Sequence, residues 1–303
     1  MKICVISPVA NSHAPRRIME EGLKRNHEMY LLSWEDLRVE ISAGNLYFGD
    51  GKKSLDYFDA IIPRSDRYGI TLQNEKITRN MNTLFRLTLE YAKKNKMFFL
   101  NSAYFSSYQS LDKLAQQFFF AENDLPGIDT HYFSAPEKTS SKPLAFPLVA
   151  KMAEGSTGTR VFKLHDNIEL GAFINDRNRD GDIFLFQKYH RIECDYRVLV
   201  VGENVLGIMK RLPKHGEWRT NFSLGGDVVA EKDDPEMVDL ASNIAAKMGF
   251  DYVGIDLLRD GEKLHIIETN ALPQFKGFEK AFPKINVAEK LIKLVEKRTS
   301  KKE

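Results

Sequence analysis

Two carboxylates and one amide stand on neighbouring apolar segments near the end of the chain. Asp256 lies in Gly-Ile-Asp-Leu-Leu, and Glu268 and Asn270 lie in Ile-Ile-Glu-Thr-Asn. Residues two apart on a strand share a face, so Glu268 and Asn270 point the same way. Such hard oxygen ligands suit magnesium beside phosphates. The alternative is the solvated face of a hairpin, although an unpaired carboxylate buried between apolar strands is costly. We predict a Mg²⁺ or Mn²⁺ site at Asp256, Glu268 and Asn270.

The spacing of these residues constrains the hairpin that carries them. A two-residue turn at Asp260-Gly261 would set Asp256 opposite His265, and Glu268 would then face the other way. A shared metal site therefore requires an odd-length loop or a β-bulge between the two carboxylates. Gly261 could supply the positive φ that such a connection often uses.

A second group of residues could bind phosphate. Lys151 ends an apolar run, and the loop Gly155, Ser156, Thr157 and Gly158 follows it. Lysine can meet phosphate as a point charge, and small residues let backbone N–H groups approach its oxygens. The loop is not a Walker A motif, because no Gly-Lys-Ser/Thr follows. An ordinary hairpin turn is the alternative.

Two further groups are weaker when each is taken alone. Lys210 and Arg211 end another apolar run, and Arg219, Thr220 and Asn221 follow, a set that could clamp a phosphate or an acyl-phosphate. An exposed basic loop is the alternative. Gln187, Lys188 and Tyr189 could offer backbone groups and an aromatic ring to adenine. The alternative is that they are ordinary residues of the protein core and of its rim.

The elements that must position these residues fall into two patterns. In the first hundred residues, apolar strands alternate with helices, which predicts a doubly wound parallel sheet. Leu84, Leu87 and Tyr91 would share the buried stripe of the long helix. The predicted strands are 2–7, 29–32, 59–63 and 97–100, with helices around Ile18 and Leu23 and over 72–94.

The second pattern, from about residue 101, is an α+β arrangement. We predict helices over 110–123, 168–175, 235–248 and 287–296. The predicted strands are 147–151, 160–164, 184–187, 196–201, 205–211, 252–258 and 263–269, the last four in antiparallel order.

Composition excludes several classes of protein. The 303 residues carry a formal net charge of +2, too balanced for a general nucleic-acid binder. Cys4 and Cys194 have no metal-ligand spacing and predict no disulfide framework. No segment is apolar over the ~20 residues that cross a membrane, and the N-terminus has no signal-peptide pattern. We expect a cytoplasmic protein with no nucleic-acid or membrane partner. Its oligomeric state is open, a homo-oligomer included.

The ordered motifs resemble the RimK-like branch of the ATP-grasp superfamily over almost the whole chain. They are Met1-Lys-Ile, Arg25-Asn-His27, Phe58-Asp-Ala-Ile-Ile-Pro-Arg64, Asp112-Lys113-Leu, Pro147-Leu-Val-Ala-Lys151, Glu154-Gly-Ser-Thr-Gly158, Asp195-Tyr-Arg-Val-Leu-Val-Val-Gly202, Gly216-Glu-Trp-Arg-Thr-Asn221, Val253-Gly-Ile-Asp256 and Glu268-Thr-Asn270. That branch includes enzymes that add glutamate to a ribosomal protein tail or to a coenzyme, and amino-group-carrier ligases of lysine biosynthesis.

The resemblance implies an ATP-grasp fold with an N-terminal pre-ATP-grasp domain at 1–100, a central lobe at 101–186 and a C-terminal lobe at 187–303. ATP would lie between the lobes. It further implies these roles: Lys113 and Lys151 at the ATP phosphates, Lys188 and Tyr189 at the adenine hinge, Asp195, Arg219, Thr220 and Asn221 at the nucleotide, Asp256, Glu268 and Asn270 at magnesium, and Arg211 at the acyl-phosphate.

Three features depart from the family pattern. Lys188 stands where the family has Glu, and the segment between Tyr189 and Asp195 is shorter than in close relatives. After Asn270 the chain reads Ala-Leu-Pro-Gln-Phe-Lys-Gly277 instead of Ser-Ser-Pro-Gly, closer to the carrier-protein ligases. That region borders the acceptor, so the substrate cannot be transferred by analogy.

The function implied is an ATP-dependent carboxylate–amine ligase that forms an acyl-phosphate and releases ADP and phosphate. A non-catalytic ATP-binding module and an ATP-grasp kinase are the alternatives. Cations beyond those that ATP needs predict an acidic substrate, with glutamate as the first candidate amine and a peptide, protein tail, carrier protein or small molecule as the carboxylate. We expect Arg64, Arg16 and Lys210 to contact substrate.

Overall fold

A four-stranded parallel sheet forms the N-terminal part of the computed structural model. The structure describes residues 1–9, 11–64, 75–108, 112–133, 145–153, 160–177, 183–216, 219 and 226–300. The sheet has the order β2 (Glu28–Leu32), β1 (Lys2–Ile6), β5 (Ala60–Pro63) and β6 (Phe98–Phe99). All three pairings are parallel, as the alternation of strands and helices predicts.

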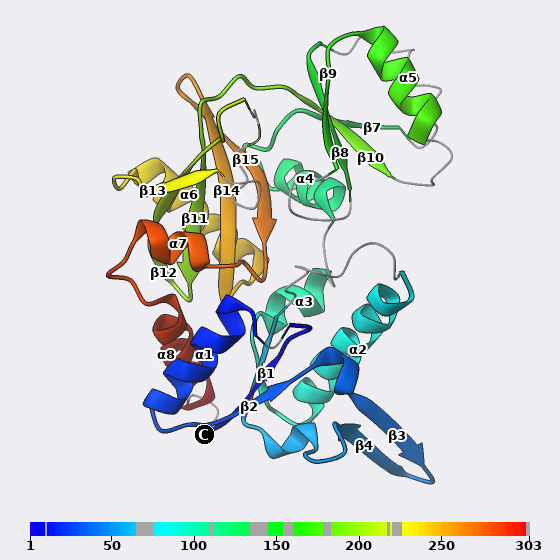
Figure 1. Cartoon of the computed structure of the whole chain (residues 1–303), viewed down its shortest axis with the longest axis vertical. Coiled ribbons are helices and arrows are strands. Elements are labelled where there is room, and N and C mark those ends of the chain that lie inside the picture. The colour runs from blue at the N-terminus through cyan, green and yellow to red at the C-terminus, as the bar shows by residue number, and fades with distance from the viewer. Residues whose placement is uncertain are drawn as a thin grey trace.

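Helices cover both faces of this sheet because every strand is apolar on both sides. Ile3 and Val5 of β1 pack with Ile18 of α1 (His13–Lys24), whereas Cys4 and Ile6 pack toward α2 (Glu75–Lys94). Figure 1 shows α1 and α2 on opposite sides of β1. The predicted stripe on α2 was wrong at Leu87, which is 40% exposed. Among the α2 side chains that the structure describes, the buried hydrophobic ones are Leu89, four residues after Phe85, and Ala92, three residues later.

The hairpin and the short helices of this part were not predicted. A hairpin of β3 (Arg38–Ser42) and β4 (Asn45–Gly49) extends from the body of the molecule (Figure 1). After β6 comes α3 (Ser102–Tyr108). The next helix, α4 (Lys113–Glu122), begins later than the predicted residue 110 because the Asp112 side chain accepts a hydrogen bond from Ala115 N (2.8 Å) and caps it.

A small antiparallel sheet has its own core. Its order is β7 (Thr130–Tyr132), β10 (Phe184–Lys188), β8 (Leu148–Met152) and β9 (Val161–Leu164). Phe184 and Phe186 point to the face that packs with Leu170 of α5 (Asn167–Arg177), so Gln187 points to the opposite face.

The largest sheet has five antiparallel strands. Their order is β13 (Asp227–Ala230), β12 (Asn204–Leu212), β11 (Asp195–Val201), β14 (Tyr252–Asp260) and β15 (Lys263–Asn270). Helix α6 (Pro235–Met248) has the predicted bounds, set by the Asp234 cap, Pro235 in the first turn and Gly249 at φ +71°. The last helices are α7 (Lys276–Ala281) and α8 (Val287–Ser300).

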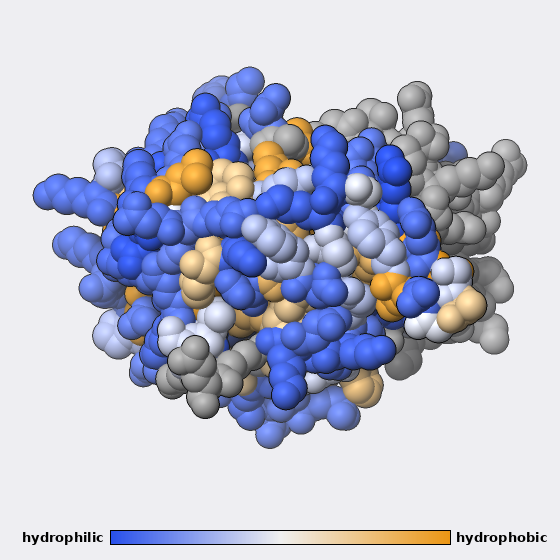
Figure 2. All heavy atoms as spheres, turned by 90° about the horizontal axis from the view of Figure 1, so that it is seen from below, coloured by the Kyte–Doolittle hydropathy of each residue, from blue (hydrophilic) through white to orange (hydrophobic). Residues whose placement is uncertain are grey.

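The parallel sheet and the five-stranded sheet share their hydrophobic core. One cluster contains Cys4 and Ile61 together with Val198 and Ile255. The outer surface is different: the face in Figure 2 is mainly hydrophilic, with hydrophobic residues in small separate groups. No helix among the described residues is both long and apolar enough to cross a bilayer.

Candidate active site

The predicted acidic residues lie on one face of the β14–β15 hairpin. Asp256 pairs directly with Glu268, and Asn270 pairs with Gly254. The register shifts between Leu257, which pairs with Ile266, and Asp256, so Ile267 is an extra residue on β15. The predicted β-bulge is therefore confirmed, as is a positive φ at Gly261 (+61°). The predicted turn position was off by one residue, because Asp260 pairs with Lys263 and leaves Gly261 and Glu262 as the turn.

Helix α4 supplies hydrogen-bond partners to backbone groups of the edge strand β15 at and after the bulge. Gln117 Nε2 donates to the carbonyl of the extra residue, Ile267 (3.0 Å). Gln116 Oε1 accepts from Thr269 N (2.7 Å). Both glutamines are buried, and an unmet backbone group there would cost the desolvation of that group. The helix that begins with Lys113 therefore also fixes the register of Glu268.

Buried arginines join the acidic face to the neighbouring strands. Across β11 and β12, Arg211 donates to both Asp195 oxygens (2.5 and 2.7 Å). Arg211 Nη2 also lies 3.0 Å from Asp256 Oδ2. Arg197 forms a bidentate pair with Asp256, both distances 2.7 Å. Sequence reasoning missed Arg197, although its position two residues after Asp195 on one strand places both on the same face.

This network is almost completely enclosed. The exposed fractions of Asp195, Arg211 and Asp256 are 5, 4 and 2%. Burial alone would raise the pKa of Asp256, but Arg197 and Arg211 outweigh it and hold that pKa below its usual value. Burial opposes the charge of Arg211 as well, and Asp195 and Asp256 more than compensate, so its pKa is raised. Asp256 and Arg211 are therefore charged at neutral pH.

Lys151 of β8 faces this network from the small sheet. Burial lowers the pKa of Lys151, Glu268 raises it, and Lys113 lowers it further, so the three groups lie within electrostatic range of one another. Lys113 follows the α4 cap, and its backbone N–H donates to Ala153 O beyond the end of β8 (3.1 Å). The structure thus brings both predicted phosphate lysines to the carboxylates. Two lysines at this position suit a polyphosphate.

The predicted adenine hinge contains one unsatisfied acceptor. Gln187 is 2% exposed and shares a sheet face with Lys151, because Val149 pairs with Gln187 and lies two residues before Lys151. Its Nε2 donates to Thr130 Oγ1 (2.9 Å), while Oε1 has no hydrogen-bond partner among the described residues. The backbone N–H groups of Lys188 and Tyr189 already donate to Asp129 O (3.3 Å) and Pro147 O (3.2 Å). Lys163, also missed, places Nζ 3.7 Å from the centre of the Tyr189 ring.

Several predicted residues stand apart from the network. Lys210 neighbours Arg211 on β12 and points to the opposite face, where it lies 3.7 Å from Glu231, so the expected basic pair does not form. The Arg16 side chain is 63% exposed beside Glu20. Arg64 is fully buried, and its Nη2 donates to Leu272 O (3.3 Å) and Pro273 O (2.9 Å). Arg219 is half-buried; Gly155, Ser156, Thr157, Gly158, Thr220 and Asn221 lie outside the described residues.

The donor set fits a hard cation in its chemistry. Asp256 and Glu268 offer carboxylate oxygens side by side, and Asn270 offers an amide oxygen that already accepts from Leu272 N (3.1 Å). Asp256 keeps acceptor capacity, since an ionised carboxylate has about four lone-pair sites and three are used. Among the described residues, no group of three or more His, Cys, Asp and Glu has a metal-binding arrangement. Any ion here would therefore depend on the amide or on groups from a ligand.

Comparison with known proteins gives the family. The model of the RimK pre-ATP-grasp domain matches residues 1–90, and that of the RimK-like ATP-grasp domain matches residues 112–295. A probable alpha-L-glutamate ligase of Legionella pneumophila (strain Corby) is 28% identical over 305 residues, 98% of this chain and 96% of the relative. The ribosomal protein bS6–L-glutamate ligase of Escherichia coli O139:H28 is 29% identical with the same coverage.

A solved structure of similar fold is the ATP-grasp ligase PsnB, complexed with a phosphomimetic variant of minimal precursor, Mg and ADP. Its TM-score is 0.73 at 18% identity, over 96% of this chain and 98% of that chain. The parallel sheet followed by two antiparallel ones agrees with this likeness. The family match extends over most of the chain, and we conclude that this protein belongs to the RimK-like ATP-grasp family of ATP-dependent carboxylate–amine ligases.

Proposed function

We propose that this protein uses ATP to activate a carboxylate as an acyl-phosphate, which an amine then attacks to form an amide. The observation that carries the proposal is the buried Asp195–Arg211–Asp256–Arg197 network beside Glu268, faced by Lys151. A carboxylate is a poor electrophile because its leaving group is poor, and phosphorylation by ATP supplies a good one. The protein then has to position the reactants and neutralise charge.

The described residues suit those two tasks. Lys113 and Lys151 would neutralise the phosphates, and Arg211, held by Asp195 and Asp256, would face the acyl-phosphate. Asp256, Glu268 and Asn270 would hold Mg²⁺ or Mn²⁺, which would offset phosphate charge. Gln187 Oε1, a buried acceptor whose amide is fixed by Thr130, suits the exocyclic amine of adenine.

Glutamate is our first candidate for the amine, and a peptide or protein tail for the carboxylate. The names of the relatives, alpha-L-glutamate ligases and a ribosomal protein bS6–L-glutamate ligase, support this choice. A carrier protein or a small molecule remains an alternative acceptor. Of the predicted substrate cations, Arg16 is accessible, whereas Arg64 contacts protein carbonyls.

Phosphate release tests the function and separates it from its alternatives. Protein, ATP and Mg²⁺ are combined with glutamate, aspartate, aminoadipate, lysine or alanine, each with candidate peptide or carrier carboxylates. A ligase releases free phosphate and forms an amide, a kinase retains phosphate on its acceptor, and a binding module leaves ATP intact.

The variant pair for this assay is Glu268→Gln and Glu236→Gln. Both remove one carboxylate charge, but Glu236 is 58% exposed and pairs with Arg259 away from the site. We expect Glu268→Gln alone to stop phosphate release. Preference for a neutral or basic amine together with a neutral carboxylate would refute the acidic substrate.

A further inference from the structure

The three residues after Asn270 are held by side chains from three other elements. Ala271 O accepts from Asn101 Nδ2 (2.5 Å), and Leu272 O accepts from Arg64 Nη2 (3.3 Å). Pro273 O accepts from both Arg64 Nη2 (2.9 Å) and Tyr252 Oη (3.0 Å). We call Arg64, Asn101 and Tyr252 the 271–273 clamp. Two of its members come from the N-terminal sheet region, and the third opens β14.

The side-chain amide of Asn101 makes four hydrogen bonds. It is fully buried, and its Nδ2 also donates to Tyr252 O (2.8 Å). Its Oδ1 accepts from Asp251 N (2.7 Å) and Tyr252 N (2.8 Å). The amide thus uses both donors and both acceptor sites. Its φ of +62° is a conformation that Asn tolerates better than most residues.

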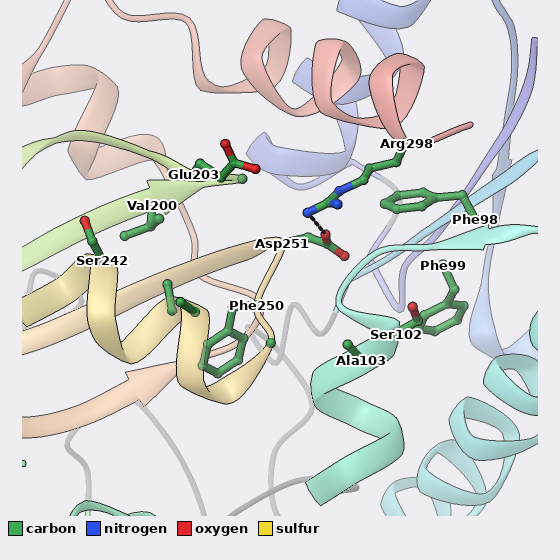
Figure 3. Close-up of a pocket in the computed structure, with 14 residues that line it drawn as sticks. Phe98, Phe99, Ser102, Ala103, Val200, Glu203, Ser242, Phe250, Asp251 and Arg298 are labelled. Carbon is green, nitrogen blue, oxygen red and sulfur yellow. Dashed lines mark ion pairs between the residues drawn. The ribbon is translucent and has the colours of Figure 1, made fainter. Parts of the chain in front are cut away.

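The clamp continues toward the C-terminal helix. Asp251 Oδ2 accepts from Asn101 N (2.9 Å), and Asp251 Oδ1 lies 3.3 Å from Arg298 Nη2 of α8. Figure 3 shows this ion pair among the residues that line a cavity of about 590 Å³, together with Phe98, Phe99 and Phe250. Phe98 belongs to β6, Phe250 follows α6 and Arg298 belongs to α8. Because Asp251 contacts both Asn101 and Arg298, the clamp lies beside the place where these parts of the chain meet.

A hydrogen bond connects the clamp to the candidate metal ligands. Leu272 donates its N–H to Asn270 Oδ1 (3.1 Å), and Arg64 holds the carbonyl of the same residue. Asn270 lies opposite Gly254, two residues before Asp256 on β14. The direction of the Asn270 amide oxygen therefore depends on where the 271–273 segment is held.

We propose that Asn101, Tyr252 and Arg64 are positioning residues that set Asn270 for metal–nucleotide binding. This inference rests on the proposed function for the identity of the ligand. Outer groups that orient a metal ligand typically affect affinity or activity by about 10–100-fold. A purely structural role would instead lower stability and leave the folded protein with unchanged affinity.

Two variants isolate the clamp. Asn101→Gly removes the side chain but permits the positive φ, so backbone strain is not introduced. Tyr252→Phe removes only the hydroxyl that reaches Pro273 O. The matched control is Tyr47→Phe, whose hydroxyl bonds Lys53 O (3.2 Å) and Gly51 N (2.7 Å) near the β3–β4 hairpin.

The first measurement is Mn²⁺ binding in the presence of ADP, followed by electron paramagnetic resonance below the unfolding temperature of every variant. We expect Kd for Mn²⁺ to rise about tenfold in Asn101→Gly and less in Tyr252→Phe, with no change in Tyr47→Phe. Unchanged Mn²⁺ affinity in both clamp variants, with only a lower Tm, would overturn the positioning role.

The second measurement is hydrogen exchange of the Leu272 amide without nucleotide or metal. Exchange should be faster in both clamp variants and unchanged in the control, because the segment loses a tether. Equal exchange in all proteins would refute the clamp itself. If the wild type binds no Mn²⁺ with ADP, the proposed function fails, while this exchange result still decides whether the clamp exists.

Discussion

Asp256 belongs both to the buried ion-pair network and to the predicted metal site. It is 2% exposed and lies between two arginines, Arg197 and Arg211. Buried ion pairs often contribute little net stability, because desolvation offsets the attraction. The network is therefore better explained by the charges that it places in the site than by a gain in stability.

We expect Arg197→Met to destabilise the protein by about 1.5–3 kcal/mol, because Asp256 loses two charge-assisted hydrogen bonds and keeps only Arg211. The pH dependence follows from the same contact. Asp256 has a depressed pKa, so its contribution is present above the ordinary value of 3.8 and is lost as pH falls through the folded value. Without Arg197 the folded pKa rises, and acid unfolding should begin at higher pH.

Urea unfolding of the metal-free protein, repeated from about pH 3 to 7, checks this prediction. The control is Arg259→Met, which removes a half-exposed arginine paired with Asp234 and Glu236 and should cost at most about 1 kcal/mol. Identical acid limbs for wild type and Arg197→Met would contradict the proposed state of Asp256.

Lys151 should be needed for turnover and dispensable for folding. Burial lowers its pKa, so the charged form costs stability below that folded value. We expect Lys151→Met to abolish phosphate release and to keep or slightly raise Tm at neutral pH. The stability difference from wild type should narrow as pH rises through the lowered folded pKa and disappear well above 10.5, where Lys151 is neutral in both states. Full activity in a destabilised Lys151→Met protein would show that this role is wrong.

At the scale of elements, the candidate site on the β14–β15 hairpin depends on two residues. One is the extra residue Ile267, and the other is Gly254, which has no side chain. Ile267 reverses the parity of β15, so that Glu268 faces Asp256. Gly254 lets neighbours approach closely, since a Cβ there would lie 3.0 Å from Pro273 Cβ and 3.3 Å from Arg197 Cδ. Both the clamped segment and the arginine of the network thus pack tightly against this glycine.

Gly254→Ala should reduce turnover at least about tenfold and cost about 1–3 kcal/mol, because Pro273 and Arg197 must move. Gly171→Ala in α5 is the matched control. A Cβ there meets nothing within 4 Å, and the added helix propensity should stabilise by about 0.5–1 kcal/mol. Steady-state kinetics and urea unfolding report both effects. Normal turnover in Gly254→Ala would show that the close approach is not needed.

At the scale of the molecule, the parallel sheet and the five-stranded sheet share a core, while the small sheet packs its own apolar face on α5. Lys151 and Gln187 belong to the small sheet, whereas Asp256 and Glu268 belong to the large one. A ligand that contacts residues of both sheets would therefore connect two hydrophobic cores that pack separately. The boundaries near residues 100 and 186 stay predictions, and the second falls inside β10 of the small sheet.

Nucleotide should therefore stabilise the whole protein, but only with metal. A ligand at 100 times its Kd adds about 2.7 kcal/mol. We expect ATP with Mg²⁺ or Mn²⁺ to raise Tm, and chelation of the metal or Glu268→Gln to abolish most of the increase. Thermal melts with ATP, with MgATP and with MgATP plus chelator make the test. Equal melts in all three would count against the metal site.

Sequence alone determined the elements whose signals are local. Asp234, Pro235 and Gly249 fix the two ends of α6, and apolar runs predicted every described strand except β3, β4, β7 and β13. It also required a bulge between Asp256 and Glu268, because side chains alternate with period two. The same alternation separates Lys210 from Arg211, which an argument from their adjacency overlooked.

Tertiary structure alone decided the contacts between distant segments. Arg64 directly follows an apolar strand, a position from which an arginine often binds a ligand. Its side chain instead donates to the carbonyls of Leu272 and Pro273, which are 208 and 209 residues away in the sequence. Asn101 reaches Ala271 across 170 residues, and Arg197 reaches Asp256 across 59. No local pattern carries such pairings, because they depend on strand order, on a one-residue register shift and on which faces pack together.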